Sequence, residues 1–272
     1  MDPFAETTWG SRLMDPSLSR KAKPRTAGLT MIIDKGLGLS AFRDLLELAG
    51  DYIDYIKLGF GTASITPLPV LREKLRLAKQ YGVYLYPGGT FFEVACAQRE
   101  ITGYFQTLSE IGFDWVEISD GSLELSATER SHAIEMARSF SFQVITEIGK
   151  KEKGSVTPID LLAETFRQDR ACGASFVIIE GRESGRSIGI FNASGEIDTN
   201  YVHDICSRVE PERIWWECPQ SGQQVTILQL LGAEANLGNI PVTEVLSVES
   251  LRRGLRSDTF FTFGSTTQEG PV

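Results

Sequence analysis

Short apolar runs alternate with amphipathic segments along almost the whole chain, and this alternation constrains the fold more than any other feature. Eight of the runs are brief and are followed by turn residues, which is typical of buried parallel strands. These strand candidates cover residues 29–34, 52–57, 83–86, 115–119, 143–147, 176–180, 213–217 and 235–237. The segments between them carry apolar residues at helical spacing, which predicts a helix after each strand.

The helix candidates have local signals of their own. Phe42, Leu45 and Leu46 recur at helical spacing, and Ser126 and Glu129 have the spacing of a capping box. The candidates cover residues 39–49, 69–81, 94–111, 127–140, 158–172, 199–209, 225–231 and 242–255. Strict alternation of eight strands and eight helices predicts an α/β fold, a single closed (β/α)8 or TIM barrel, with a doubly wound sheet as the alternative.

No linker or change in composition divides the 272 residues, so we expect one barrel domain over residues 28–263. Residues 1–27 are polar and include a basic run at 20–25, which we interpret as a mobile N-terminal arm or a clasp between subunits. A solvated tail is the simpler interpretation of this composition. Residues 264–272 are expected to form a C-terminal tail.

Charge and residue counts exclude several functional classes. The 27 Lys and Arg residues against 36 Asp and Glu residues give a formal net charge of -9, which argues against general nucleic-acid binding. No apolar stretch reaches the roughly 18 residues of a membrane span, and residues 1–27 lack the apolar core of a secretion signal. The four cysteines form no C-x-x-C pair, so we expect a cytoplasmic protein without zinc or disulfides.

Acidic residues recur at the carboxyl ends of the predicted strands, which is where (β/α)8 barrels carry their chemistry. Glu117, Glu147, Glu180 and Glu217 end four successive strands. Oxygen ligands of this kind suit Mg²⁺, and the two histidines of the chain are too few for a three-histidine metal site. We therefore predict a Mg²⁺ site at these four glutamates; pairing with strand-end lysines is the alternative interpretation.

Basic and glycine-rich positions at the same strand ends indicate an anionic substrate. The basic residues are Lys35, Lys57, Lys150, Lys151, Arg182 and Arg186. Arginine suits forked binding of a carboxylate or phosphate, and lysine acts as a point charge or a proton donor. The glycines of Gly88-Gly89 and Gly238-Asn239 favour close backbone approach to an anion, and the second pair is expected after the last strand, where barrels often bind phosphate.

One motif points to another class of protein. Residues 36–41 read G-x-G-x-x-A between a strand and a helix, which is the dinucleotide-binding form. The next strand ends in Lys57 and not in the acidic residue that binds a ribose, so we disfavour a nucleotide-binding fold.

Five sequence blocks resemble the phosphosulfolactate synthase family. They lie at residues 53–62, 88–93, 117–121, 180–185 and 254–261, in the family's order, and the likeness extends from about residue 24 to residue 263. The resemblance implies a (β/α)8 lyase that adds sulfite to C3 of phosphoenolpyruvate in a Mg²⁺-dependent reaction. The product would be (2R)-2-phospho-3-sulfolactate, on a route to coenzyme M or to sulfolactate.

Two alternatives to this function remain at this point. The family includes plant heat-stress relatives, so a non-catalytic protein of that type is one alternative. Another barrel lyase that acts on a phosphorylated carboxylic acid is the other. We expect only small-molecule substrates, with no nucleic acid or membrane partner, and a homo-oligomer for which a trimer is the first hypothesis.

The chemistry of sulfite addition suggests roles for individual residues. Attack at C3 moves negative charge into the substrate carboxylate, which a bound metal would stabilise, and C2 must then receive a proton. We assign this proton to Lys151, just past Glu147, with Lys57 as the next candidate and phosphate binding as the alternative role of Lys151. Lys150 and a bound metal are expected to lower the pKa of Lys151. Lys57, Arg182 and a lysine of the 150–151 pair are expected to converge on the substrate.

Overall fold

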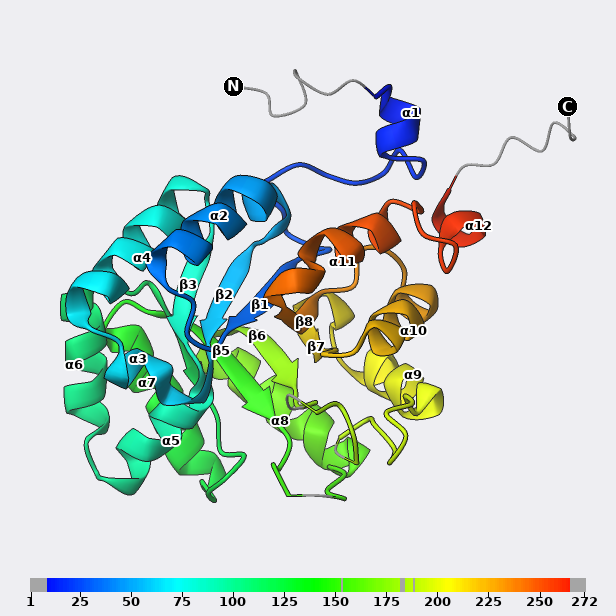
Figure 1. Cartoon of the computed structure of the whole chain (residues 1–272). Coiled ribbons are helices and arrows are strands. Elements are labelled where there is room, and N and C mark those ends of the chain that lie inside the picture. Colours follow the sequence, from blue (N-terminus) through cyan, green and yellow to red (C-terminus); the bar gives the residue numbers. More distant parts are fainter. Residues whose placement is uncertain (1–8, 153, 182–183, 188, 265–272) are drawn as a thin grey trace, which may run out of the picture.

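The computed structural model describes residues 9–152, 154–181, 184–187 and 189–264, and it confirms the predicted barrel fold. Eight parallel strands lie inside a ring of helices (Figure 1). The strands are β1 (Thr30–Asp34), β2 (Tyr55–Leu58), β3 (Tyr84–Pro87), β4 (Trp115–Ile118), β5 (Gln143–Ile148), β6 (Ala174–Ile179), β7 (Ile214–Glu217) and β8 (Leu237–Pro241).

The pairing of the strands nearly closes the barrel. Their hydrogen-bonded order is β3-β2-β1-β8-β7-β6-β5-β4, so β1 pairs with both β2 and the last strand, β8. The strands β3 and β4 are the two ends of this series and lie beside each other. All strands are parallel, so their carboxyl ends meet at one mouth.

Helices separate the strands in sequence and cover the outer face of the barrel. The longer ones are α2 (Leu39–Ala49), α4 (Leu68–Gln80), α5 (Gly89–Ala97), α6 (Ile101–Ile111), α7 (Ala127–Ser139), α8 (Ile159–Cys172), α9 (Thr199–Arg208), α10 (Ser221–Leu231) and α11 (Val245–Arg252). The short ones are α1 (Ser11–Met14), α3 (Thr62–Ile65) and α12 (Phe260–Phe263). The capping box of Ser126 and Glu129 at the start of α7 is confirmed. No helix within the described ranges has the length and apolarity needed to cross a bilayer.

Several sequence-based boundaries are wrong. The expected helix at 94–111 is two helices, α5 and α6, because the chain turns at Arg99, whose φ is 60°. The strand expected from residue 52 begins at Tyr55, because residues 50–52 form a 3-10 turn. The last strand extends to Pro241, so Gly238 and Asn239 lie inside β8 and not after it. Turn-forming residue types suggested an end there, but the amide of Cys218 donates to the Gly238 carbonyl.

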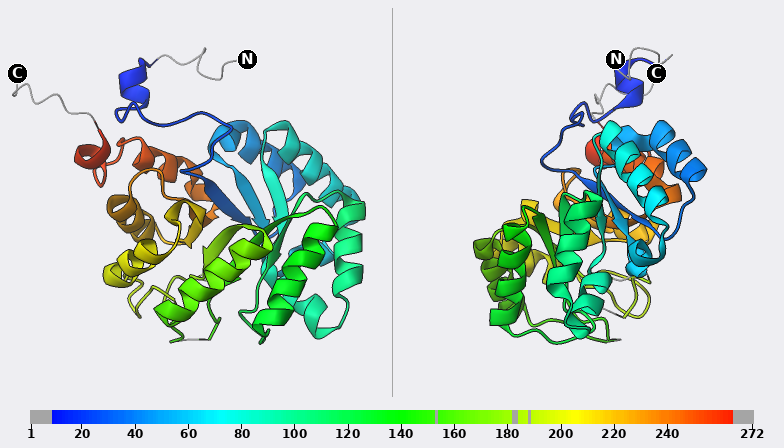
Figure 2. Two further views of the ribbon diagram at one scale, coloured as in Figure 1. Left: turned by 180° about the vertical axis from the view of Figure 1, so that it is seen from behind. Right: turned by 90° about the vertical axis from the view of Figure 1, so that its left-hand side faces the viewer.

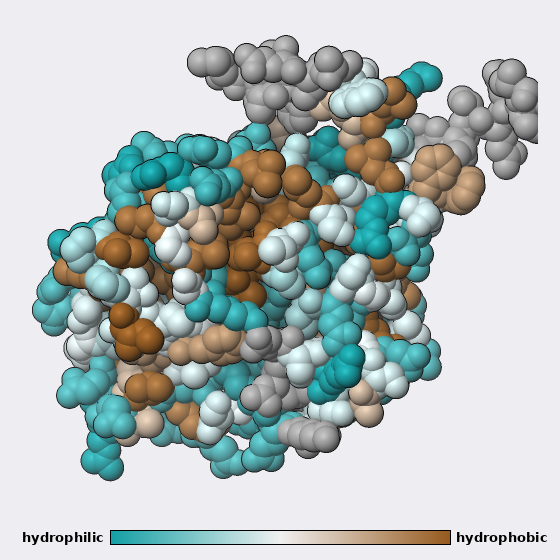
Figure 3. Space-filling view, viewed as in Figure 1, coloured by the Kyte–Doolittle hydropathy of each residue, from teal (hydrophilic) through white to brown (hydrophobic). Residues whose placement is uncertain are grey.

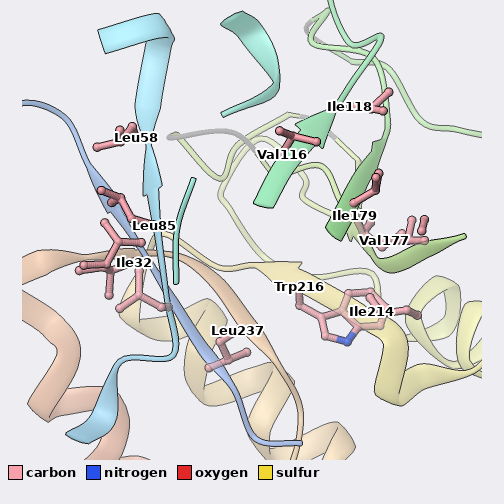
Figure 4. Close-up of a cluster of buried hydrophobic side chains, with 14 of the residues drawn as sticks. Ile32, Leu58, Leu85, Val116, Ile118, Val177, Ile179, Ile214, Trp216 and Leu237 are labelled. Carbon is pink, nitrogen blue, oxygen red and sulfur yellow. The ribbon is translucent and has the colours of Figure 1, made fainter. Parts of the chain in front are cut away.

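Side chains alternate between two apolar layers along the strands. Outward-pointing residues such as Ile32, Val116 and Trp216 pack against the helices (Figure 4). Inward-pointing residues form a smaller cluster of Leu29, Met31, Tyr55, Tyr86, Trp115, Ile145, Phe176, Ile178 and Trp215. On the face in Figure 3 the outer helices carry mostly hydrophilic side chains, and a hydrophobic area lies between α2 and α11.

The positions of the inward-pointing apolar residues determine which ionisable residues also point into the barrel. Successive residues of a strand point to opposite faces, so the next inward position lies two residues further along. For Tyr55, Trp115, Ile145, Ile178 and Trp215, that position is a lysine or a glutamate: respectively Lys57, Glu117, Glu147, Glu180 and Glu217. The alternation therefore places five ionisable side chains above an aromatic floor, at the mouth of the barrel.

The basic run at 20–25 is attached to the other end of the barrel, so it is not a solvated tail. The Arg20 guanidinium donates to both carboxylate oxygens of Glu249, at 3.0 and 3.1 Å, and to the Gly28 carbonyl at 2.9 Å. Arg25 pairs with Asp54 at 3.1 Å. Further along the arm, α1 stands away from the strands and lies near α12 (Figure 2). A clasp between subunits stays a prediction.

We expect Arg20→Ala to lower the free energy of unfolding at pH 7 by about 2 kcal/mol. Removing one partner of a buried pair costs roughly 3–5 kcal/mol, and Arg253 remains bound to Glu249 at 2.8 Å and reduces that cost. Lys21→Ala is the control, because Lys21 is exposed and 3.4 Å from Glu234, and we expect it to change stability by less than about 0.5 kcal/mol. Urea unfolding measures both. Equal effects of the two substitutions would contradict the attachment of the arm.

The same pair predicts a pH dependence. Burial alone would raise the pKa of Glu249, but Arg20 and Arg253 outweigh it and hold the pKa below its ordinary value. The pair therefore stabilises the protein above the unfolded carboxylate value of about 4.3, and this contribution is lost as the pH falls through the lower folded pKa. Unfolding at acid pH should show a smaller difference between wild type and Arg20→Ala.

Candidate active site

Lys57 lies at the centre of the mouth, enclosed by carboxylates. Its ammonium is 3.1 Å from Glu117, 3.3 Å from Glu147 and 3.0 Å from Glu217, and the side chain is buried. Burial alone would lower its pKa, but these three carboxylates raise it well above the ordinary lysine value. Lys57 is therefore a fixed positive charge at neutral pH.

Backbone amides fix two of these carboxylates. The amide of Gly89 donates to Glu117 at 2.7 Å, and the amide of Gly181 donates to Glu217 at 3.0 Å. Gly88 and Gly89 begin α5, so an amide at a helix N-terminus faces the mouth. A Cβ at position 89 would lie 2.7 Å from Glu117 Oε1 and would also clash with Ser119, so this approach requires glycine.

We expect Gly89→Ala to destabilise the protein by about 1–3 kcal/mol, the usual effect of an extra methyl group in a packed site. The Cβ would also push Glu117 from its amide and lower activity. Gly222→Ala is a matched control, because Gly222 lies in the first turn of α10 with no atom within 4 Å of the added carbon. Thermal unfolding of both variants checks this. Equal stabilities of Gly89→Ala and Gly222→Ala would argue against the close approach of Gly89 to Glu117.

Three of the four predicted metal ligands meet at one point. Glu147, Glu180 and Glu217 are buried, and each places a carboxylate oxygen within 4.8 Å of the others. Burial and the charges of Glu147 and Glu217 raise the pKa of Glu180 well above its ordinary value. Burial would also raise the pKa of Glu147, but Lys151 and Lys57 outweigh it and lower it.

Glu117 has different partners from the other three. It contacts Lys57 and the Gly89 amide and lies outside the trio that could share one ion. Burial, partly offset by Lys57, raises its pKa to about 7.

Lys151 approaches the site from the loop after β5. Its ammonium is 2.9 Å from Glu93 and 3.5 Å from Glu147. Burial alone would lower its pKa, but these two carboxylates outweigh burial and raise it, so the lowering expected from Lys150 is wrong. The expectation assumed a repulsive neighbour, but Lys150 turns toward Asp120, 3.1 Å away, and toward the Leu123 carbonyl.

A cavity of about 630 Å³ unites these groups. Among the sequence-predicted site residues, those that line it are Lys57, Gly88, Gly89, Glu117, Glu147, Lys151, Glu180, Glu217 and Asn239. Asn239 is 5% exposed, its φ is 53°, and its Oδ1 has no hydrogen-bond partner among the described residues. The structure thus gathers most of the predicted residues around one space.

Other predicted residues lie elsewhere. Lys35 lines an adjoining cleft that shares Asn239 with the cavity, and its ammonium is 5.7 Å from the Phe60 ring centre. Gly238 packs on Met31: a Cβ added at Gly238 would lie 2.7 Å from the Met31 methyl carbon. Arg186 is exposed and is not among the described residues that line the cavity. Arg182 lies outside the described residues.

Sequence reasoning missed two buried residues beside the cavity. Glu93 bonds to Lys151, and the Ser119 hydroxyl lies 2.5 Å from Glu93 and 2.9 Å from Glu147. Both belong to the blocks at 88–93 and 117–121. Ser119 ends the strand expected at 115–119 but carries no charge, and Glu93 lies beyond the end of the preceding strand. In the sequence, the signal that these two residues lie near the site was their spacing from Gly89 and Glu117.

Comparison with known proteins identifies the family. The model of the family (2R)-phospho-3-sulfolactate synthase (ComA) matches residues 18–258, nearly the whole barrel. The chain belongs to the phosphosulfolactate synthase family. It is 41% identical over 242 residues to the phosphosulfolactate synthase of Methanothermobacter thermautotrophicus, covering 88% of this chain and 94% of that protein. It is 42% identical to that of Methanocaldococcus jannaschii, covering 86% and 94%. These relatives confirm the predicted enzyme family.

A solved structure of low sequence identity agrees with the fold, and one distant relative has another name. The 3-hexulose-6-phosphate synthase of Salmonella typhimurium superposes with a TM-score of 0.55 at 13% identity, covering 82% of this chain and 98% of that one. The Arabidopsis thaliana protein HEAT-STRESS-ASSOCIATED 32 is 18% identical, covering 86% of this chain and 88% of that protein. The synthase relatives are thus much closer than the heat-stress relative.

Proposed function

We propose that this cavity joins sulfite to C3 of phosphoenolpyruvate and yields (2R)-2-phospho-3-sulfolactate. One observation carries the proposal: two ammonium groups, Lys57 and Lys151, and a cluster of three carboxylates face one cavity. Two anionic substrates need positive charge at the place where they react. The negative charge that develops on the phosphoenolpyruvate carboxylate during the reaction also needs positive charge nearby. Membership of the synthase family supports this substrate class.

The residues fit a divalent cation. The described lining contains four carboxylates, Glu117, Glu147, Glu180 and Glu217, against the ammonium groups of Lys57 and Lys151. When all four carboxylates are ionised, this lining would repel anions unless further positive charge is bound. A doubly charged ion bound by Glu147, Glu180 and Glu217 would balance it, and oxygen ligands favour Mg²⁺. When bound, Mg²⁺ would supply positive charge to the substrate carboxylate.

The chain's own residues supply the proton and the positioning. The sulfite sulfur forms the bond to C3, the C2–C3 π pair moves toward C2 and the carboxylate, and C2 takes one proton. We assign that proton to the Lys151 ammonium, which lines the cavity and remains charged at neutral pH. Lys57 is buried among three carboxylates and fixes their positions, and Glu147 contacts both lysines.

Substrate oxygens have further candidate partners around the rim. We assign phosphate and carboxylate binding to the amide of Asn239 and to Lys35 in the adjoining cleft. Gly88 and Gly89 line the cavity, but their amides donate to the Leu58 carbonyl and to Glu117, so the predicted backbone contact with a substrate anion does not fit. Arg182 remains a predicted anion-binding residue on sequence grounds. Supply of the product to coenzyme M or sulfolactate synthesis, a cytoplasmic location and a homo-oligomer, with a trimer as the first hypothesis, stay predictions.

The test is incubation of the purified protein with phosphoenolpyruvate, sulfite and Mg²⁺, followed by ³¹P NMR and mass spectrometry. We expect a phosphorylated sulfonate whose formation requires sulfite. Omission of sulfite is the control, because another lyase would consume a phosphorylated acid without it. A folded protein that forms no product would favour a non-catalytic, heat-stress-type role and contradict the proposal.

A further inference from the structure

We propose that Glu93 is a positioning residue that holds the Lys151 ammonium at the cavity. This inference rests on the proposed function, because it concerns how Lys151 is presented to the substrate. Glu93 lies on α5, whereas Lys151 lies in the loop after β5, so the contact joins a helix and a loop that are far apart in the sequence. Their ion pair measures 2.9 Å, and Glu93 is only 4% exposed.

Glu93 is fixed by more than its lysine. Its Oε1 accepts from the Gly121 amide at 3.1 Å, and its Oε2 accepts from the Ser122 amide at 3.0 Å. The Ser119 hydroxyl lies 2.5 Å from Oε1. Both oxygens are therefore bound by the segment that follows β4, and the carboxylate has a defined place before it meets Lys151.

The same segment also fixes the stem of the lysine. The Lys151 amide donates to the Gly121 carbonyl at 2.9 Å. A Cβ at position 121 would lie 2.9 Å from two of the lysine's methylene carbons, so the stem lies directly on the glycine. With its stem on Gly121 and its ammonium on Glu93, the long side chain loses the rotamer freedom of an exposed lysine.

Glu93 acts through Lys151 and not on the substrate. It is not among the described residues that line the cavity, whereas Lys151 and Glu147 are. The Ser119 hydroxyl has one hydrogen and lies between Glu93 and Glu147, so it joins the two carboxylates that flank the lysine. The arrangement aims one ammonium group between Glu93 and the proposed metal ligands.

A double-mutant cycle tests this dependence. We expect Glu93→Gln, which keeps the shape but removes the charge, to lower kcat by about tenfold or more. In a Lys151→Ala background the same change should lower kcat by less than about twofold, because the positioned group is gone. Glu110→Gln on the exposed face of α6 is the control and should leave kcat unchanged. Equal effects of Glu93→Gln in both backgrounds would overturn the proposal.

Chemical labelling gives a readout that needs no turnover. Brief treatment with acetic anhydride, followed by peptide mass spectrometry, compares labelling of Lys151 with that of the exposed Lys21 in the same sample. We expect Glu93→Gln to raise the relative labelling of Lys151 about threefold or more, and Glu93→Asp, which keeps the charge, to raise it less. Unchanged labelling in folded Glu93→Gln would overturn the positioning role. An inactive wild type would instead overturn the proposed function.

Discussion

Lys151→Ala is expected to lower kcat for the reaction of phosphoenolpyruvate with sulfite by roughly 10²–10⁴-fold, with a smaller change in KM. The physical reason is the loss of the proposed proton donor to C2. Its ammonium group lines the cavity and is 2.9 Å from Glu93. Steady-state kinetics with both substrates varied in turn measures the split between kcat and KM.

Lys150→Ala is the matched control for this variant. Lys150 is the adjacent residue in the sequence, but its ammonium contacts Asp120 at 3.1 Å and the Leu123 carbonyl at 2.8 Å, away from the cavity. We expect kcat to change only a few-fold in this variant. If Lys151→Ala instead raises KM and lowers kcat by less than about tenfold, Lys151 binds phosphate and Lys57 becomes the next candidate donor.

The pKa of Lys151 adds a pH dependence to this prediction. Glu147 and Glu93 outweigh burial and raise this pKa above the ordinary lysine value of about 10.4. The protonated form therefore persists throughout the neutral and mildly alkaline range. Without a bound ion, we expect Lys151 to keep its proton up to about pH 9, and deprotonation of Lys151 near pH 7 in a titration of the protein would contradict its ion pairs.

The sequence predicted the barrel and most of the site because both follow from local periodicity. Alternation along a strand puts Lys57, Glu117 and Glu217 two residues beyond an inward-pointing aromatic residue, and parallel strands bring all their ends to one mouth. Position along a strand is thus enough to identify these residues as neighbours. The same reasoning misplaced the end of β8, because glycine and asparagine favour turns unless neighbouring strands pair with them.

Contacts between loops were not predictable in this way. Lys150 and Lys151 are equivalent in the sequence, and only the folded loop turns one toward Asp120 and the other toward Glu93. The sign of the Lys151 pKa shift was wrong for the same reason, because it depends on which carboxylates surround the ammonium. Glu93 was given no role because it lies beyond the strand end, on a helix, one turn after the residue whose amide binds Glu117.

Removal of divalent cations is expected to abolish the reaction, and readdition of Mg²⁺ should restore it. The carboxylate trio and the excess of negative charge in the described lining supply the physical reason. Exhaustive chelation followed by dialysis, with activity measured before and after addition of Mg²⁺, tests this. Full activity after chelation would contradict a metal-dependent site.

Glu180→Gln should weaken Mn²⁺ binding, measured by electron paramagnetic resonance as a substitute for Mg²⁺, by at least about tenfold. Glu117→Gln is the comparison, because Glu117 contacts Lys57 and the Gly89 amide outside the trio, and we expect less than about a threefold change. Burial and its neighbours raise the pKa of Glu180, so protons compete with the ion for this carboxylate and the ion should bind more weakly as the pH falls. Calorimetry in two buffers should detect proton release when the wild type binds the ion. Glu180→Gln should show no such release. Equal Mn²⁺ affinities in the two variants would place the ion elsewhere.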